Sequence, residues 1–364
     1  MEEARRSDVG VGYLKAPNVQ ELAKQQVATI PLQFNQGDIE KTSYNSSMLL
    51  PQVPVIDMEK LLAIGDGTPE LERLHFACKE WGFFQVVNHG VSSSLVEKVK
   101  SEIRAFFDLP LEERKKFEQQ EGNLQGYGKD FIYSEDQKLD WVDLFYIITS
   151  PTHLRSPHLY PKLPVSLRDT TEAYCKEVKS LAIRMMCLMA KALRMDEKEM
   201  RELYSDGTQS IRVNYYPPCP EPDKTIGLSP HSDTDALTIL LQMNQTEGLQ
   251  VWKDDIWVPI KPLPNAFIVN VGDMIEILSN GIYRSIEHRA VVNSKEERLS
   301  LATFHIFNVG SELGPAHSLI GPNNPPIFRR THIGNSFEDF AKRKQYGKSY
   351  IHLMKLETKD NDES

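Results

Sequence analysis

Several features that mark well-known classes of protein are missing from this sequence. No run of about 18 apolar residues is present, so no segment is predicted to cross a membrane as a helix. The N-terminal stretch MEEARRSDVGVGYLK lacks the apolar core of a signal peptide, which argues against secretion. The cysteines form no C-x-x-C pair, so we expect reduced thiols in a cytoplasmic protein rather than a disulfide framework or a zinc site. The four cysteines are Cys78, Cys175, Cys187 and Cys219.

Basic residues are outnumbered as well. The chain has 42 Lys and Arg against 51 Asp and Glu, a formal net charge of −9, and no basic stripe. This balance disfavours nucleic acid as a partner. Hydrophobic residues make up 40% of the 364 residues, which is enough for one large core or two modest ones. We therefore expect a globular protein with no nucleic-acid or membrane partner, and a monomer is the default expectation.

Apolar periodicity divides the chain into five segments. Residues 1–50 form a polar extension, and residues 51–160 mix strand and helix patterns. Residues 161–206 hold the longest helical pattern, which predicts a spine helix from Val165 to about Met195. Residues 207–310 contain many short apolar runs separated by turn residues, a pattern typical of a β-sandwich or barrel. Residues 311–364 are predicted to be a helical segment and a disordered tail.

Two strands and two helices are predicted in the second segment. We expect an edge strand at 53–57, an amphipathic helix at 69–81 and a buried strand within 81–90. Ser94 and Glu97 fit a capping box, which predicts a helix that begins after Ser94.

Pairs of polar residues spaced i, i+2 stand out among the predicted strands of the fourth segment. Successive strand residues point to opposite faces, so the members of each pair share a face. The pairs are His231 with Asp233, Asn214 with Tyr216, and Arg298 with Ser300. His288 lies on a further predicted strand. The polar turn at 293–297 predicts that His288 and Arg298 lie on adjacent strands of a hairpin.

These residue types fit one chemistry. Two histidines and one carboxylate form the facial triad of non-haem Fe(II) oxygenases, which leaves coordination positions open. Arg298 and Ser300 suit a carboxylate, because guanidinium binds it in fork geometry. A buried guanidinium is costly without an anion, which favours an acidic co-substrate such as a keto acid.

Each residue alone also has a plain structural interpretation. A lone H-x-D is usually a surface loop, His288 could be a core histidine, and Arg298 could form a surface ion pair. The conjunction of order, strand context and spacing is what favours the metal site. His89 ends a turn and His305 faces away from Ser300 by strand parity, so both are predicted to be structural.

At these residues the chain resembles the plant 2-oxoglutarate- and Fe(II)-dependent dioxygenase family. The likeness lies nearest the group of senescence-related proteins and codeine-type O-demethylases, and it covers most of the chain. The motifs that carry it are 53–57 (VPVID), 81–90 (WGFFQVVNHG), 140–143 (DWVD), 214–219 (NYYPPC), 227–233 (GLSPHSD), 261–267 (KPLPNAF), 270–273 (NVGD), 279–289 (SNGIYRSIEHR) and 297–304 (ERLSLATF).

The resemblance implies an α+β protein with a double-stranded β-helix, or cupin-like jelly roll, and flanking α-helices. It implies that Fe(II) binds His231, Asp233 and His288. It also implies that 2-oxoglutarate is held by Arg298 and Ser300 with help from Tyr216 and Asn214. Oxidation by O2 would release succinate and CO2 through an Fe(IV)-oxo species that abstracts a substrate hydrogen, with ascorbate as a candidate reductant. Hydroxylation or O-demethylation of a small aromatic alkaloid or flavonoid would follow.

An aromatic-lined pocket would suit such a planar substrate. The residues expected near it are Phe131, Tyr133, Leu144, Phe304 and Phe307. Two alternatives stay open from the sequence. One is an oxidase or condensing enzyme of the same fold that uses no keto acid, and the other is a non-catalytic small-molecule receptor.

Overall fold

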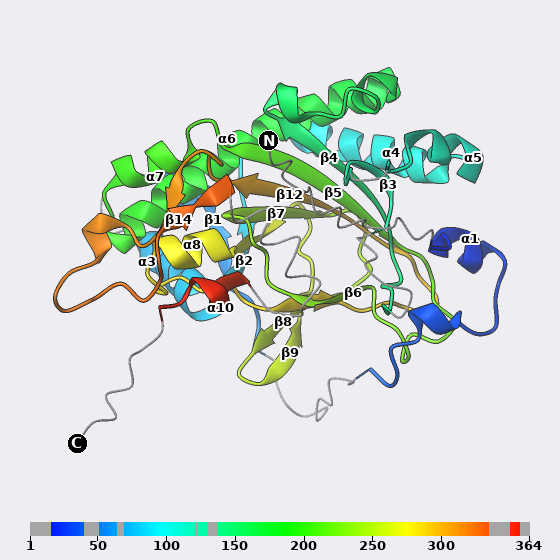
Figure 1. Cartoon of the computed structure of the whole chain (residues 1–364). Coiled ribbons are helices and arrows are strands. Elements are labelled where there is room, and N and C mark those ends of the chain that lie inside the picture. The colour runs from blue at the N-terminus through cyan, green and yellow to red at the C-terminus, as the bar shows by residue number, and fades with distance from the viewer. Residues whose placement is uncertain are drawn as a thin grey trace, which may run out of the picture.

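Two facing β-sheets and an outer layer of helices make up the molecule (Figure 1). The computed structural model describes residues 16–39, 51–63, 69–120, 123–129, 137–334 and 350–356. The larger sheet has eight strands in the order β1-β2-β10-β7-β12-β5-β4-β3, and the smaller has four in the order β6-β11-β8-β9. This arrangement agrees with the predicted jelly roll.

The strands of the larger sheet are β1 (Val55–Asp57), β2 (Phe83–Val87), β3 (Gly126–Gly128), β4 (Asp143–Ser150), β5 (Thr208–Tyr216), β7 (Leu237–Gln242), β10 (Phe267–Val271) and β12 (Arg298–Ile306). Those of the smaller sheet are β6 (Leu228–His231), β8 (Leu249–Lys253), β9 (Ile256–Pro259) and β11 (His288–Ala290). A two-stranded sheet pairs β13 (Glu312–Leu313) with β14 (Thr331–His332).

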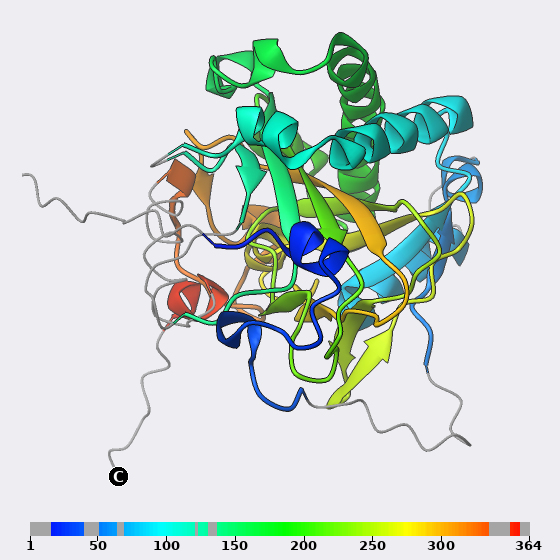
Figure 2. The same ribbon diagram turned by 90° about the vertical axis from the view of Figure 1, so that its right-hand side faces the viewer.

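The helices lie mainly on the outer face of the larger sheet (Figures 1 and 2). They are α1 (Val19–Lys24), α2 (Met58–Leu62), α3 (Pro69–Phe76), α4 (Ser93–Asp108), α5 (Leu111–Arg114), α6 (Val165–Leu193), α7 (Glu197–Tyr204), α8 (Asp273–Leu278) and α10 (Tyr350–Met354). Short 3-10 turns span Leu32–Phe34, Lys115–Phe117, Thr152–Leu154, Tyr160–Lys162 and His317–Leu319. The 29-residue α6 is the predicted spine helix.

Hydrophobic residues form two main clusters on opposite sides of the larger sheet. The larger cluster packs α3, α4 and α6 against the outer face and includes Leu301 and Met185. A smaller cluster lies between the two sheets and includes Phe83 and Val251. The space between the two sheets is therefore lined only in part by apolar residues. Polar side chains can occupy the rest of its lining.

Two local predictions need correction. Helix α4 is capped by Ser92, whose side chain accepts a hydrogen bond from the Leu95 amide, and not by Ser94. The predicted helix at 69–81 is an α-helix only to Phe76 and ends in a π-helical turn, Ala77–Trp81. Gly82 then takes a φ of 60°, and a Cβ there would lie 2.2 Å from the Arg284 carbonyl oxygen.

The predicted hairpin between the His288 and Arg298 strands is wrong. Strand β11 pairs with β6 and β8 in the smaller sheet, whereas β12 pairs with β5 and β7 in the larger one. The polar turn at 293–297 therefore crosses from one sheet to the other. In a jelly roll a connection of this kind places consecutive strands on opposite walls.

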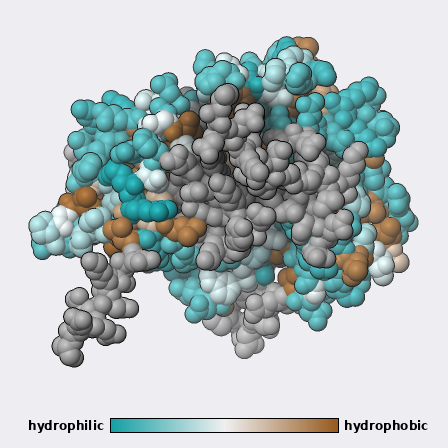
Figure 3. Space-filling view, viewed as in Figure 1, coloured by the Kyte–Doolittle hydropathy of each residue, from teal (hydrophilic) through white to brown (hydrophobic). Residues whose placement is uncertain are grey.

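Among the described residues, no helix is long and apolar enough to span a bilayer. Among the coloured residues of the face seen in Figure 3, most are hydrophilic, and the hydrophobic ones form small separate patches. All four cysteines are free, as predicted.

Candidate metal centre and carboxylate clamp

Three side chains from the smaller sheet and the turn after it converge on one point. His231 ends β6 and pairs in register with His288 at the start of β11. Asp233 follows His231 by two residues, and its Oδ1 lies 3.5 Å from His231 Nε2 and 3.7 Å from His288 Nε2. One ligand atom from each of the three residues lies within 4.8 Å of the others, so the group could hold a metal ion.

Both imidazoles are oriented by backbone carbonyls. His231 Nδ1 lies 2.8 Å from the Ser229 carbonyl oxygen, and His288 Nδ1 lies 3.2 Å from that of Ile286. A carbonyl can only accept, so Nδ1 carries the hydrogen and each Nε2 lone pair points toward Asp233. Burial lowers the pKa of His288 to about 4, which keeps this ring neutral near pH 7.

The two oxygens of the Asp233 carboxylate have different surroundings. Its Oδ2 accepts hydrogen bonds from Thr238 Oγ1 at 2.6 Å and Asn270 Nδ2 at 2.7 Å. Oδ1 is left facing the two imidazoles. Two nitrogens and one oxygen converging in this way match the donor set of the facial triad for non-haem Fe(II). The sequence did not assign Thr238 or Asn270 to the site, although Asn270 lies in one of the family motifs.

Residues expected to bind a carboxylate gather on the neighbouring wall, in the larger sheet. Strand β12 aligns Arg298 with Tyr216 and Ser300 with Asn214 on β5. The Arg298 guanidinium carbon lies 5.2 Å from the Tyr216 ring centroid. Arg298 Nη2 donates to Gln242 Oε1 at 2.8 Å, and Nη1 lies 3.5 Å from Ser300 Oγ. Gln242 is a further member that the sequence did not indicate.

Arg298 has the features expected of an anion site. Its side chain is buried, Nε has no hydrogen-bond partner, and burial lowers its pKa. Within the described part of the chain, no carboxylate forms an ion pair with it. A buried guanidinium without a counter-charge is costly, so a bound carboxylate would fit this position. The Asn214 amide oxygen instead accepts from Arg212 Nε at 2.7 Å.

The clamp and the metal centre are linked through the sheet register. Phe304 lies four residues along β12 from Ser300, which is about 13 Å of strand. Phe304 aligns with Thr238 on β7, whose hydroxyl bonds Asp233. The clamp residue Ser300 and the residue Thr238 that supports Asp233 therefore lie along the same pair of strands, β7 and β12.

The residues predicted for the substrate pocket separate into three groups. Phe131 and Tyr133 lie outside the described residues. Leu144 aligns with Asn214, and Phe304 shares the interior face with Ser300 and packs on the cluster between the sheets. Phe307 is fully buried in the larger cluster on the helix side, so its placement near the pocket is corrected. Residues three apart in an extended chain point to opposite faces of the sheet. This is why Phe304 lies between the sheets and Phe307 lies on the helix side.

The histidines predicted to be structural are held by the fold. His89 Nδ1 accepts from the Val91 amide at 3.1 Å, and its ring lies 4.4 Å from that of Phe267. His305 is fully buried and lies 3.2 Å from the Leu237 carbonyl oxygen through Nδ1.

Two regions of the chain match known protein families. Residues 207–306 match the 2OG-Fe(II) oxygenase superfamily, and residues 53–163 match the N-terminal region described as non-haem dioxygenase in morphine synthesis. The chain belongs to the 2OG-Fe(II) oxygenase superfamily. It is therefore an oxidoreductase that uses Fe(II) and 2-oxoglutarate, with the double-stranded β-helix fold of that family.

Curated relatives and a solved structure match nearly the whole chain. Thebaine 6-O-demethylase of Papaver somniferum is 50% identical, covering 98% of this chain and 100% of the relative. Protein SRG1 of Arabidopsis thaliana is 49% identical, covering 93% and 96%. Oxoglutarate-dependent flavonoid 7-O-demethylase 1 of Ocimum basilicum is 48% identical, covering 94% and 92%. The structure of JOX2 in complex with 2OG, Fe and JA has a TM-score of 0.82 at 33% identity, covering 94% and 99%.

Proposed function

We propose that this oxygenase O-demethylates or hydroxylates a small aromatic specialised metabolite, such as a methoxylated alkaloid or flavonoid. The observation that carries the proposal is the presence, in one barrel, of the His231–Asp233–His288 group and of the buried Arg298, whose Nε has no partner in the protein. The relatives named as O-demethylases of an alkaloid and a flavonoid support the substrate class.

In this proposal each wall of the barrel has one task. His231, Asp233 and His288 hold Fe(II), which would supply the activation of O2. Arg298, Ser300 and the protonated Tyr216 phenol bind the far carboxylate of 2-oxoglutarate. Asn214, whose amide oxygen also accepts from Arg212 Nε, helps to orient this carboxylate.

The overall reaction balances with known co-substrates. An aryl methyl ether, 2-oxoglutarate and O2 would give the hydroxymethyl ether, succinate and CO2. The hydroxymethyl ether then collapses to the free hydroxyl compound and formaldehyde. With a C–H bond in place of the methyl ether, the same steps give an alcohol. Ascorbate would serve only to keep the iron reduced.

The remaining proposals concern the pocket and the setting. Leu144 and Phe304 contribute apolar surface on the interior face, and Phe131 and Tyr133 remain candidates for the substrate pocket. We also propose that the protein acts as a cytoplasmic monomer without a nucleic-acid partner.

The test is turnover of a substrate panel. Protein loaded anaerobically with Fe(II) is given 2-oxoglutarate, O2 and methoxylated alkaloids, flavonoids and coumarins, and products are identified by mass. Loss of a methylene group marks demethylation, and gain of one oxygen marks hydroxylation. Succinate formation must match product formation and disappear in Asp233→Ala. Turnover without 2-oxoglutarate would instead support an oxidase or condensing enzyme, and absence of both product and succinate would support a receptor.

A further inference from the structure

The 140–143 segment, Asp140-Trp-Val-Asp, is a motif that the proposed reaction leaves without a role. Its residues join several parts of the barrel end. The Trp141 amide donates to the Ile226 carbonyl at 2.8 Å, and its indole Nε1–H donates to the Pro217 carbonyl at 3.1 Å. Val142 packs in a small cluster with Tyr216. The segment therefore lies against the chain that leads into β6 and against the carboxylate clamp.

Asp140 is connected to His231 by hydrogen bonds through one residue, Ser229. Its Oδ1 accepts from Ser229 Oγ at 2.6 Å, and its Oδ2 accepts from the Ser229 amide at 3.0 Å. The Ser229 carbonyl in turn accepts from His231 Nδ1 at 2.8 Å. Two hydrogen bonds to one residue fix its backbone, so the Asp140 carboxylate sets where the Ser229 carbonyl points. That carbonyl sets the tautomer and orientation of His231.

The two imidazoles differ in how much they depend on such support. The His288 side chain is only 9% exposed, and its ring lies 5.1 Å from that of Phe83 in an edge-to-face contact. The His231 side chain is 35% exposed. His231 is therefore less restricted by packing than His288. Its orientation depends more strongly on the hydrogen bond to the Ser229 carbonyl.

The N-terminal strap, residues 16–39, crosses this end of the barrel (Figure 2). It also contacts Asp140. Gln36 Nε2 donates to Asp140 Oδ1 at 3.2 Å, while the Gln36 amide donates to the Lys224 carbonyl at 2.9 Å. The Phe34 ring lies 5.3 Å from the Trp141 ring in a T-shaped contact. The strap therefore contacts both Asp140, through Gln36, and Trp141, through Phe34.

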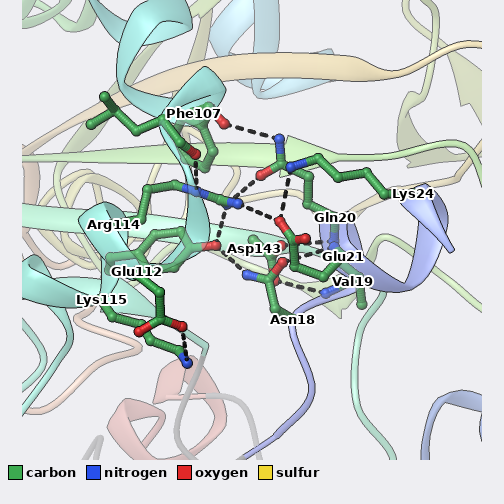
Figure 4. A network of polar contacts seen from close by, with 12 residues as sticks. Asn18, Val19, Gln20, Glu21, Lys24, Phe107, Glu112, Arg114, Lys115 and Asp143 are labelled. Carbon is green, nitrogen blue, oxygen red and sulfur yellow. Dashed lines mark hydrogen bonds and ion pairs between the residues drawn. The ribbon is translucent and has the colours of Figure 1, made fainter.

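The far end of the strap is pinned by a buried polar network (Figure 4). The Asp143 carboxylate accepts from the first amides of α1, Val19 at 3.1 Å and Gln20 at 2.9 Å. The fully buried Arg114 donates to Glu21 Oε1 at 2.7 Å and also to the Gln20 side chain. Because Asp143 and Asp140 share one short segment, docking of α1 and placement of Asp140 are mechanically linked.

We propose that Asp140 is a positioning residue for the metal ligand His231, and that the N-terminal strap holds Asp140 in place through Gln36. The inference rests on the proposed role of His231 as a ligand. It assigns a function to the 140–143 motif and to the strap that is separate from binding substrate.

Metal affinity is the direct test, because it needs neither substrate nor turnover. Co(II) is titrated into the full-length metal-free protein under anaerobic conditions, and its visible spectrum reports ligand geometry. Asp140→Asn is expected to weaken Co(II) binding by about 10–100-fold, the usual effect of removing an outer partner of a metal ligand. The bound Co(II) spectrum should also shift, which loss of general stability would not cause.

Further variants separate positioning from folding. Ser229→Ala keeps Asp140 but removes one of its two bonds, and Gln36→Ala removes the strap contact; both should weaken binding less than Asp140→Asn. The Asp140→Asn/Gln36→Ala double variant should bind like Asp140→Asn alone, since both act through one chain of contacts. The exposed Asp169→Asn on α6 serves as the matched control and should bind as wild type.

Each outcome decides the matter. If folded Asp140→Asn binds Co(II) with wild-type affinity and spectrum, the positioning role is wrong. If Asp140→Asn does not fold, wild-type binding by both Ser229→Ala and Gln36→Ala would overturn it. If the wild-type protein itself binds no metal and Asp233→Ala is no different, the proposed function fails instead.

Discussion

The two faces of the eight-stranded sheet carry different kinds of residue. On β12, Arg298, Ser300 and Phe304 face the smaller sheet, whereas Leu299 and Leu301 face the helices. The first set is polar or partly accessible and surrounds the site, and the second is part of the main hydrophobic cluster. Because side chains alternate between the two faces of β12, residues of the site and residues of the hydrophobic core lie next to one another in the sequence. Substitutions on the inner face should change binding, and those on the outer face should change the free energy of unfolding.

The largest effect is expected at the metal centre itself. Asp233→Ala removes one proposed ligand, the carboxylate that Thr238 and Asn270 support. Outer partners alone typically account for about 10–100-fold in affinity, so loss of this ligand should exceed about 100-fold. The measurement is Fe(II) affinity under argon, with circular dichroism as the folding control. Near-normal affinity in the folded variant would place the metal elsewhere.

The carboxylate clamp should respond independently of the metal. Arg298→Gln removes the charge that no acidic residue of the described chain balances. Hydrogen bonds to charged groups contribute about 1.5–3 kcal/mol, so the KM for 2-oxoglutarate should rise by roughly 10–100-fold. Metal affinity without 2-oxoglutarate should stay the same. An unchanged KM would show that the co-substrate carboxylate binds another group.

A substitution on the outer face of the sheet should lower stability and leave binding of 2-oxoglutarate unchanged. Leu301 is fully buried against the helices, so Leu301→Ala should reduce the free energy of unfolding by about 2–5 kcal/mol. Denaturant unfolding measures this loss, and the KM for 2-oxoglutarate should remain near wild type. A variant with normal stability but an impaired KM would break the division between the two faces.

A pH dependence of stability is also expected, from His305 on the outer face. Burial lowers its pKa to about 3 from the ordinary 6.5. Its Nδ1–H donates to the Leu237 carbonyl and its Nε2 accepts from Gln209, so only the neutral ring satisfies both. The unfolded chain takes up the proton first, so stability should fall as pH drops below 6.5 toward 3.

His305→Asn provides the comparison for this effect. It should be less stable than wild type at pH 7 but lose less stability between pH 6.5 and 4, as followed by thermal unfolding. Identical slopes for the two proteins would show that other groups dominate the acid transition.

Strand parity explains why much of the site could be predicted from the sequence. It placed Arg298 with Ser300 on one face and His305 on the other, because direction in a strand depends only on near neighbours. The candidate metal ligands were predicted from residue type and spacing, and the structure brings the three side chains together, although Asp233 lies just beyond β6.

Contacts between distant segments could not be predicted in the same way. Asp140 lies 89 residues from Ser229, and Gln36 lies 104 from Asp140. The sheet to which β11 belongs also depends on packing across the whole barrel, which is why the hairpin prediction failed. Ser92, Ser93 and Ser94 offered similar hydroxyls, and only the path of the chain before α4 decided that Ser92 is the cap.

Calorimetric titration of 2-oxoglutarate under argon most directly tests the claim that two walls of one barrel bind iron and a keto acid together. With Fe(II) present, the wild-type protein should bind one equivalent, and both Asp233→Ala and Arg298→Gln should bind much more weakly while remaining folded. Equal binding of 2-oxoglutarate by wild type and both variants, or binding unaffected by removal of Fe(II), would contradict the account.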